Sequence, residues 1–146
     1  MNEQRCAVRH LRTIILQALA TAGQTTVKCE PSPLDVSLWH RPTVALKHMA
    51  DGPDRRITGA YSLGVDALWE VVAVGPADTV DELGALSEIA HRAIENTHGE
   101  NPDGHVRFCL RERTVSFPFV GEDGNRYHQV GGIYRLRVKG EHGSGL

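Results

Sequence analysis

Apolar residues in this chain recur with two different periods, and each period occupies its own part of the sequence. Over residues 4–22 and 79–96 they recur every three or four positions, as on one face of an α-helix. Gly23 and Gly99 follow these segments, and glycine is the usual residue just beyond a helix end. Elsewhere apolar and polar residues alternate, which is typical of half-buried strands. Each helix and strand has one face to bury, so the sequence predicts helices packed on a sheet.

The alternating stretches predict the strands of this sheet. A short strand is expected near the first helix, followed by strand fragments split by Pro42 and then by two adjacent antiparallel strands or one long bent strand. A closing hairpin is expected around an Asp-Gly turn, which is the usual residue pair in tight hairpins. In chain order, these segments are residues 25–29, 36–49 and 61–74, and then 106–119 and 127–139 on either side of the turn at 121–125.

Single residues add detail to the sheet. Pro118 lacks a backbone N–H, which predicts that its strand lies at an edge or carries a bulge. The Gly131-Gly132 pair predicts a bulge in the last strand. The alternation there predicts that Tyr134 and Leu136 point inward.

These patterns together predict an α+β fold. We expect a two-layer sandwich in which a curved, mainly antiparallel sheet carries both helices on one face and sends out a protruding loop or hairpin. With 146 residues, the chain has the length of one domain, expected over 1–140, and 141–146 is expected to form a flexible C-terminal tail.

Composition excludes several classes of protein. Sixteen basic and eighteen acidic residues give a net charge of −2, which does not indicate a nucleic-acid binder by bulk charge. No apolar run approaches the roughly 18 residues of a membrane span, so no membrane partner is expected. Cys6, Cys29 and Cys109 are odd in number and widely spaced, which predicts reduced thiols and no disulfide framework.

Known chemical motifs are absent from the sequence. It contains no HExxH, no GxSxG and no glycine-rich phosphate loop, so we expect no catalytic residues, no cofactor and no metal. His91 and Glu95 lie one helical turn apart and could ligate a metal together, although a surface pair is the simpler interpretation. A small enzyme or ligand-binding domain that uses His91, Glu95 or Cys109 stays open as an alternative.

Two regions are candidates for contacts with other proteins. Residues 50–56 are rich in turn formers and charge, which predicts a loop that reaches a neighbour. Outward-pointing basic residues on the last strands could form a stripe that contacts nucleic acid or an acidic surface, or simply a solvated face. The interface candidates are Trp39, Asp51, Asp54, Arg55, Arg56, Arg135, Arg137 and Lys139, and the stripe would add Arg107, Arg111 and Arg113.

The layout resembles the tail-terminator and related tail-completion (minor tail) proteins of long-tailed bacteriophages. The resemblance covers residues 5–139: an amphipathic helix, a Pro-rich segment, a strand hairpin, a capped helix and a closing hairpin. Its most telling piece is the final hairpin, which reads GEDGNRYH at the turn and IYRLRV in the last strand. The charged stretch at 51–56 and the Gly131-Gly132 pair depart from the commoner pattern.

The resemblance implies a structural virion protein without catalytic residues. Such proteins form homohexameric rings that cap the tail tube, stop its polymerisation and join the tail to the head. The implied partners are further copies of the chain, the tail-tube protein and the head–tail connector, with non-specific proximity to DNA in the lumen. The implied location is the head–tail interface of the virion, after assembly in the host cytoplasm. A head-completion or neck protein is the alternative within virion assembly.

Overall fold

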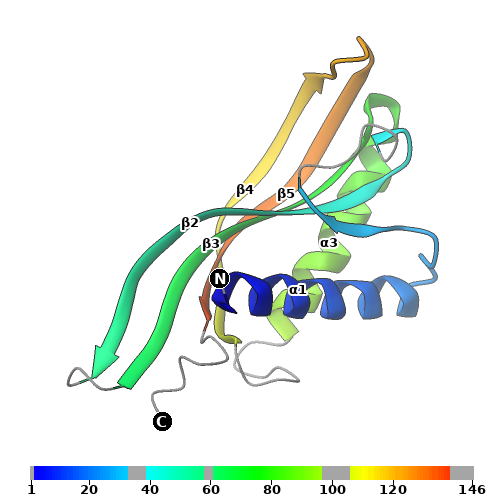
Figure 1. Ribbon diagram of the computed structural model, residues 1–146. Coiled ribbons are helices and arrows are strands. Elements are labelled where there is room, and N and C mark those ends of the chain that lie inside the picture. Colours follow the sequence, from blue (N-terminus) through cyan, green and yellow to red (C-terminus); the bar gives the residue numbers. More distant parts are fainter. Residues whose placement is uncertain (1, 33–38, 58–60, 97–105, 139–146) are drawn as a thin grey trace.

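The computed structural model describes residues 2–32, 39–57, 61–96 and 106–138 (Figure 1). The prediction of a flexible tail over 141–146 lies outside these ranges. The elements in chain order are α1 (Asn2–Thr21), β1 (Cys29–Pro31), β2 (Thr43–Ile57), β3 (Tyr61–Pro76), the 3-10 turn η1 (Ala77–Thr79), α3 (Val80–Asn96), β4 (Val106–Val120) and β5 (Arg126–Val138).

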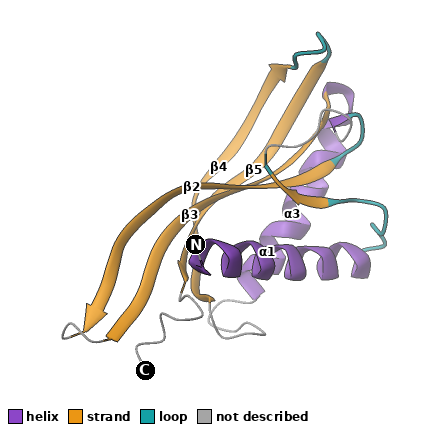
Figure 2. Ribbon diagram, in the orientation of Figure 1, coloured by secondary structure: helices purple, strands orange, loops and turns teal. Residues whose placement is uncertain are grey.

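The described strands form a single mixed sheet. Its strand order is β1-β2-β3-β5-β4, and every pair is antiparallel except the parallel pair β1–β2. Both helices lie on the same side of this sheet, and the β2–β3 hairpin extends well past them at one end (Figure 2). The predicted α+β architecture with helices on one face is confirmed.

The core lies between the two helices and the inner face of the sheet. The predicted helical stripes supply most of its helical side chains, and β3 contributes every second residue because side chains on a strand alternate between faces. Buried core residues include Leu11, Ile15 and Leu19 of α1, Leu83, Leu86 and Ile94 of α3, Trp69 and Val71 of β3, and Tyr134 and Leu136 of β5. Tyr134 and Leu136 point inward, as predicted.

Hydrogen bonds fix the end of α1 and the start of α3, while Gly99, predicted to end the second helix, lies outside the described residues. Beyond α1, Gly23 has φ +82°, and the Gln24 N–H donates to the Leu19 carbonyl at 2.8 Å. A residue with a Cβ would be strained there, so the glycine fits the predicted helix end. Before α3, the Thr79 hydroxyl donates to the Pro76 carbonyl at 2.6 Å. This bond closes the short 3-10 turn that leads into α3.

The predicted strand over 25–29 is largely wrong, because the strand begins only at Cys29. Pairing with β2 decides its position: Cys29 lies opposite Val44, and the Ser32 N–H donates to the Leu46 carbonyl at 2.7 Å. From the helix side, Arg12 Nε donates to the Cys29 carbonyl at 3.0 Å. Tertiary contacts therefore place this strand later in the chain than local composition predicts.

The predicted loop over 50–56 is also wrong. These residues belong to β2, which pairs with β3 as far as Ile57. The register shifts three times along this pair, and one shift lies between Asp51 and Asp54, around Gly52 and Pro53. A bulge accommodates residues that do not fit a regular ladder, so the strand continues through a turn-rich sequence.

Of the two alternatives left open for 61–74, the single long strand is confirmed, because β3 runs unbroken over these residues. The strand that carries Pro118 is an edge strand, as predicted, because β4 is the last strand of the sheet. A proline is tolerated there since its missing N–H removes no bond from a central ladder.

The predicted bulge at Gly131-Gly132 is wrong. Both glycines pair in regular register with β3, Gly131 opposite Val72 and Gly132 opposite Val71. The irregularities of this hairpin lie instead in β4, between Val106 and Phe108 and between Arg111 and Arg113. Close approach of backbones explains the first glycine: a Cβ on Gly131 would lie 2.0 Å from the Val71 carbonyl oxygen.

Replacing Gly131 with alanine should therefore destabilise the fold. We expect the free energy of unfolding to fall by about 2–3 kcal/mol, as for an overpacked core, because β5 must move away from β3. Urea denaturation followed by circular dichroism measures this loss. The matched control is Gly84→Ala in α3, where a Cβ meets no atom within 4 Å and helix propensity favours alanine. Equal stability of the two variants would contradict the close approach.

Candidate interaction surfaces

The predicted interface residues do not form one surface. Asp51 of β2 pairs with Ala67 of β3, which in turn pairs with Leu136 of β5. The neighbouring residue Arg137 of β5 pairs with Asp66 of β3. The charged end of β2, which carries both acidic and basic residues, and the basic end of β5 therefore share one end of the sheet, with β3 between them. Trp39 lies against the other end, beside the turn between β4 and β5.

The structure places Asp51, Asp54, Arg55 and Arg56 in the backbone of β2 and does not describe their side chains. They lie on a paired strand of the protruding hairpin rather than on a free loop. The same holds for Arg137 in β5, while Lys139 lies outside the described residues. Their role in an interface stays a prediction.

The predicted basic stripe is split between two faces of the sheet. Residues that pair across antiparallel strands point to the same face. Arg111 pairs with Tyr134 on the helix side, whereas Arg113 pairs with Ile133 and Arg135 pairs with Leu110 on the outer side. The bulge in β4 causes the split, because its extra residue reverses the alternation of the strand.

On each face of the sheet, one of these arginines has a partner within the chain: Arg111 on the helix side and Arg135 on the outer side. The Arg111 guanidinium lies 5.9 Å from the centre of the Tyr134 ring, within reach of a cation–π contact. Arg135 Nε donates to the Glu112 carboxylate, which comes from the bulge itself. Glu112 thus neutralises part of the positive charge expected on this surface.

Trp39 packs against aromatic residues of its own chain. Its ring lies 5.7 Å from that of Phe119 and 5.2 Å from that of Tyr127, both edge to face, and Phe119 stacks on Tyr127 at 5.6 Å. A Cβ on Gly121 would lie 3.0 Å from the indole. Trp39 therefore packs against the turn between β4 and β5 and stabilises it. The sequence alone did not indicate this structural role.

The turn itself is fixed by Asp123. The Tyr127 hydroxyl and the backbone N–H of Asn125, at 3.0 Å, both donate to its carboxylate. The bond from Tyr127 is the main reason that the pKa of Asp123 is lowered, and the same bond raises the pKa of Tyr127. Gly124 has φ +80°, as a tight turn of this sequence requires.

The outer face of the sheet carries an apolar groove. Ala45, Val72 and Val74 form its floor, and Trp39 and Phe119 pack beside them. The groove has a volume of about 240 Å³ and is bordered by polar residues that include Lys47, Glu70 and Gln129.

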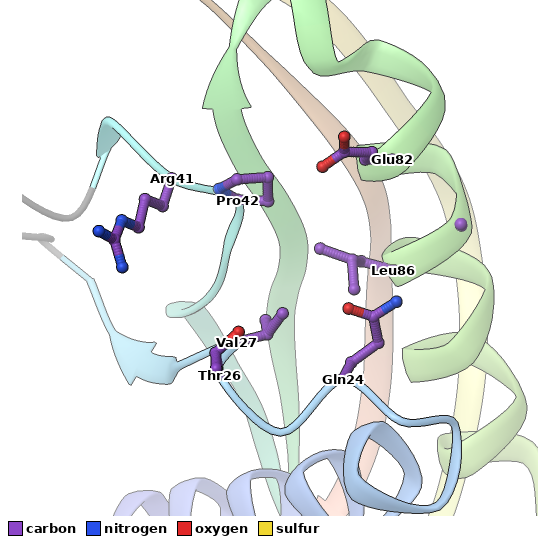
Figure 3. Close-up of a pocket in the computed structure, with 8 residues that line it drawn as sticks. Gln24, Thr26, Val27, Arg41, Pro42, Glu82 and Leu86 are labelled. Carbon is purple, nitrogen blue, oxygen red and sulfur yellow. The ribbon is translucent and has the colours of Figure 1, made fainter.

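A second, larger cavity lies on the helix side of the molecule (Figure 3). Its volume is about 440 Å³, and its walls come from the α1–β1 connection, the start of β2 and the first two turns of α3. Its apolar residues are Val27, Pro42, Ala85 and Leu86, and Arg41 and Glu82 lie on opposite sides of it. No sequence pattern indicates this cavity, because it joins three segments that are distant in the chain.

The residues named for an enzymatic alternative engage one another. His91 Nδ1 lies 2.9 Å from the Tyr134 hydroxyl, and His91 Nε2 lies 3.1 Å from Glu95 Oε1. Burial raises the pKa of Tyr134 to about 12, so this hydroxyl stays protonated at neutral pH. Both nitrogens of His91 thus have partners in the chain. The side chain of Cys109 lies outside the described residues.

Within the described ranges, no cluster of three or more His, Cys, Asp or Glu side chains is arranged to hold a metal ion. None of the helices in these ranges is long and apolar enough to cross a membrane.

The chain is similar to known proteins in structure but not detectably in sequence. No family model matches the chain, and no curated protein matches it. Among solved structures, a chain described as "Virion of native gene transfer agent (GTA) particle" is 17% identical, with a TM-score of 0.48. The match covers 88% of this chain and 94% of that one. At this identity and TM-score the likeness assigns no function to this chain.

Trp39→Ala should destabilise the isolated monomer. Because the indole is half-buried against two rings, we expect a loss of about 2 kcal/mol, below the cost at a fully buried site. Thermal or urea unfolding of the monomer measures it, and Trp39→Phe is the control that retains an aromatic contact. Unchanged unfolding of the alanine variant would show that Trp39 does not support the turn.

Cys29 should resist alkylation in the native state near pH 8, because the reactive species is the thiolate. Burial is the main cause that raises the pKa of Cys29 from 9.0 to about 12. A raised pKa means that the protonated thiol contributes stability below about pH 9 and that this contribution is lost as the pH rises toward 12. Iodoacetamide labelling followed by peptide mass mapping checks this. Labelling of Cys29 at equal rates in folded and urea-unfolded protein would contradict it.

Proposed function

We propose that this chain is a structural virion protein that acts as a phage tail terminator. Copies of it form a closed ring at the end of the tail tube, stop tube polymerisation and present a surface to the head connector. The sequence resemblance supports this function. One structural observation also supports it: among the described strands, the sheet has two unlike open edges.

The first edge is β4. It has fifteen residues and pairs only with β5, so no described strand covers its other side. The second edge is β2, where β1 pairs only with residues 44–46 and leaves the rest of the strand open among the described residues. An open edge offers unpaired N–H and C=O groups to another strand.

Unlike edges favour a closed ring over a symmetric pair. A contact between two different patches repeats head to tail, and it closes when the rotation between copies divides a full turn. Half-exposed apolar side chains on β4, Leu110 at 50% and Phe117 at 44%, would gain burial in such a contact. These features support self-association rather than the binding of a small molecule.

A head-completion or neck protein is the second candidate. It would use the same edges to form a ring, but its ring would bind DNA-filled heads rather than tail tubes. The divided arginines on β4 and β5 do not favour either candidate, because those whose side chains are described do not share one face of the sheet. The binding partner of the ring is therefore the property that separates the two functions.

Native mass spectrometry of the purified chain, alone and with tail-tube protein, tests the proposal. We expect one dominant closed oligomer, of six copies by the resemblance, and electron microscopy should show a ring on the tube end. Binding to heads but not to tubes would favour the neck protein. A chain that stays monomeric in both conditions, or that turns over a small molecule, would refute ring formation.

A further inference from the structure

We propose that the turn between β4 and β5 of one copy inserts into the 440 Å³ cavity of the next copy. This inference rests on the proposed function, since it names a contact between neighbouring copies of the ring in addition to the open strand edges. We call the turn residues 120–126 the knob, and the cavity between the α1–β1 connection and α3 the socket.

The knob is rigid and has an apolar tip. Val120 is 67% exposed, while the other exposed large apolar residues among those described are 39–50% exposed. The hydrogen bonds to Asp123 and the packing of Trp39 and Tyr127 hold the turn in one shape. A preorganised element loses little conformational entropy when it binds, so it suits an interface.

Two opposite charges flank this tip. Glu122 lies in the turn, and Arg126 lies directly opposite Val120 in the last register pair of the hairpin. Both are exposed, and neither forms an ion pair or a side-chain hydrogen bond with any described residue. The nearby charge of Asp123 is already engaged within the turn.

The socket presents the complementary pattern. Val27, Pro42 and Leu86 give it an apolar lining, with Arg41 on one side and Glu82 on the other (Figure 3). Neither charged side chain has a partner among the described residues.

Knob and socket therefore match in polarity and in charge. Val120 would cover the apolar lining, Glu122 would face Arg41, and Arg126 would face Glu82. Charge complementarity of this kind fixes the orientation of partners and suppresses wrong ones. Because knob and socket are different patches, the contact is heterologous, as a ring requires. All the complementary groups belong to this chain, so the partner is a second copy.

Charge reversal tests the contact. Glu122→Arg and Arg41→Glu should each weaken assembly by about tenfold or more, since each places like charges together. The double variant Glu122→Arg with Arg41→Glu should restore assembly to within a few-fold of the wild type. Mass photometry across a dilution series measures the assembly constant, and thermal melting checks that each variant is folded.

The control exchanges two charges outside the proposed contact. Glu88 and Arg92 form a 3.0 Å ion pair on the exposed face of α3, and Glu88→Arg with Arg92→Glu reverses both without changing the net charge. This control should assemble like the wild type. Val120→Ser should weaken assembly without affecting either charge pair.

The outcomes separate this inference from the proposed function. If the wild type forms rings but the single variants assemble equally well, or if the double variant fails to recover, the knob-and-socket contact is wrong and the ring stands. If the wild type stays monomeric with and without tail-tube protein, both are wrong.

Discussion

The backbones of the paired strands β5 and β3 lie very close together at Gly131, and the arrangement of the rest of the sheet depends on this close approach. A Cβ at position 131 would lie 2.0 Å from the carbonyl oxygen of Val71, so only glycine fits opposite β3 at this point. The register of β5 follows from it. A slip of one residue would move Tyr134 and Leu136 from the helix face to the outer face and leave the core unfilled. Both helices pack on the surface that this register presents.

The same register decides the chemistry of the outer surface. It places Arg135 beside the bulge residue Glu112, where the two charges pair, and it leaves Arg111 on the opposite face over Tyr134. One extra residue in β4 is enough to divide a run of arginines that alternates regularly in the sequence. The surface is consequently mixed in charge, which suits contact with another protein better than contact with a polyanion.

The molecule combines a self-sufficient core with surfaces that are incomplete. Two helices cover one face of the sheet, and the aromatic cluster around Trp39 covers part of the other. Its open strand edges, exposed turn tip and unpaired charges are local features at the periphery. Such an arrangement separates folding from assembly, since substitutions at the periphery can change self-association and leave the core intact.

The sequence by itself determined both helices, the closing hairpin, the inward residues of its last strand and the α+β class, because these depend on periodicity within short segments. Tertiary structure alone decided that residues 50–56 form a strand, that Gly131 lies in a regular ladder and that the bulge lies in β4. It also decided that Trp39 supports the turn of its own chain. In each case the stabilising contacts come from a partner strand or an aromatic ring that is distant in the chain. Local composition carries no information about such a partner, which is why turn-forming residues were predicted to form a loop where the neighbouring strand makes them part of the sheet.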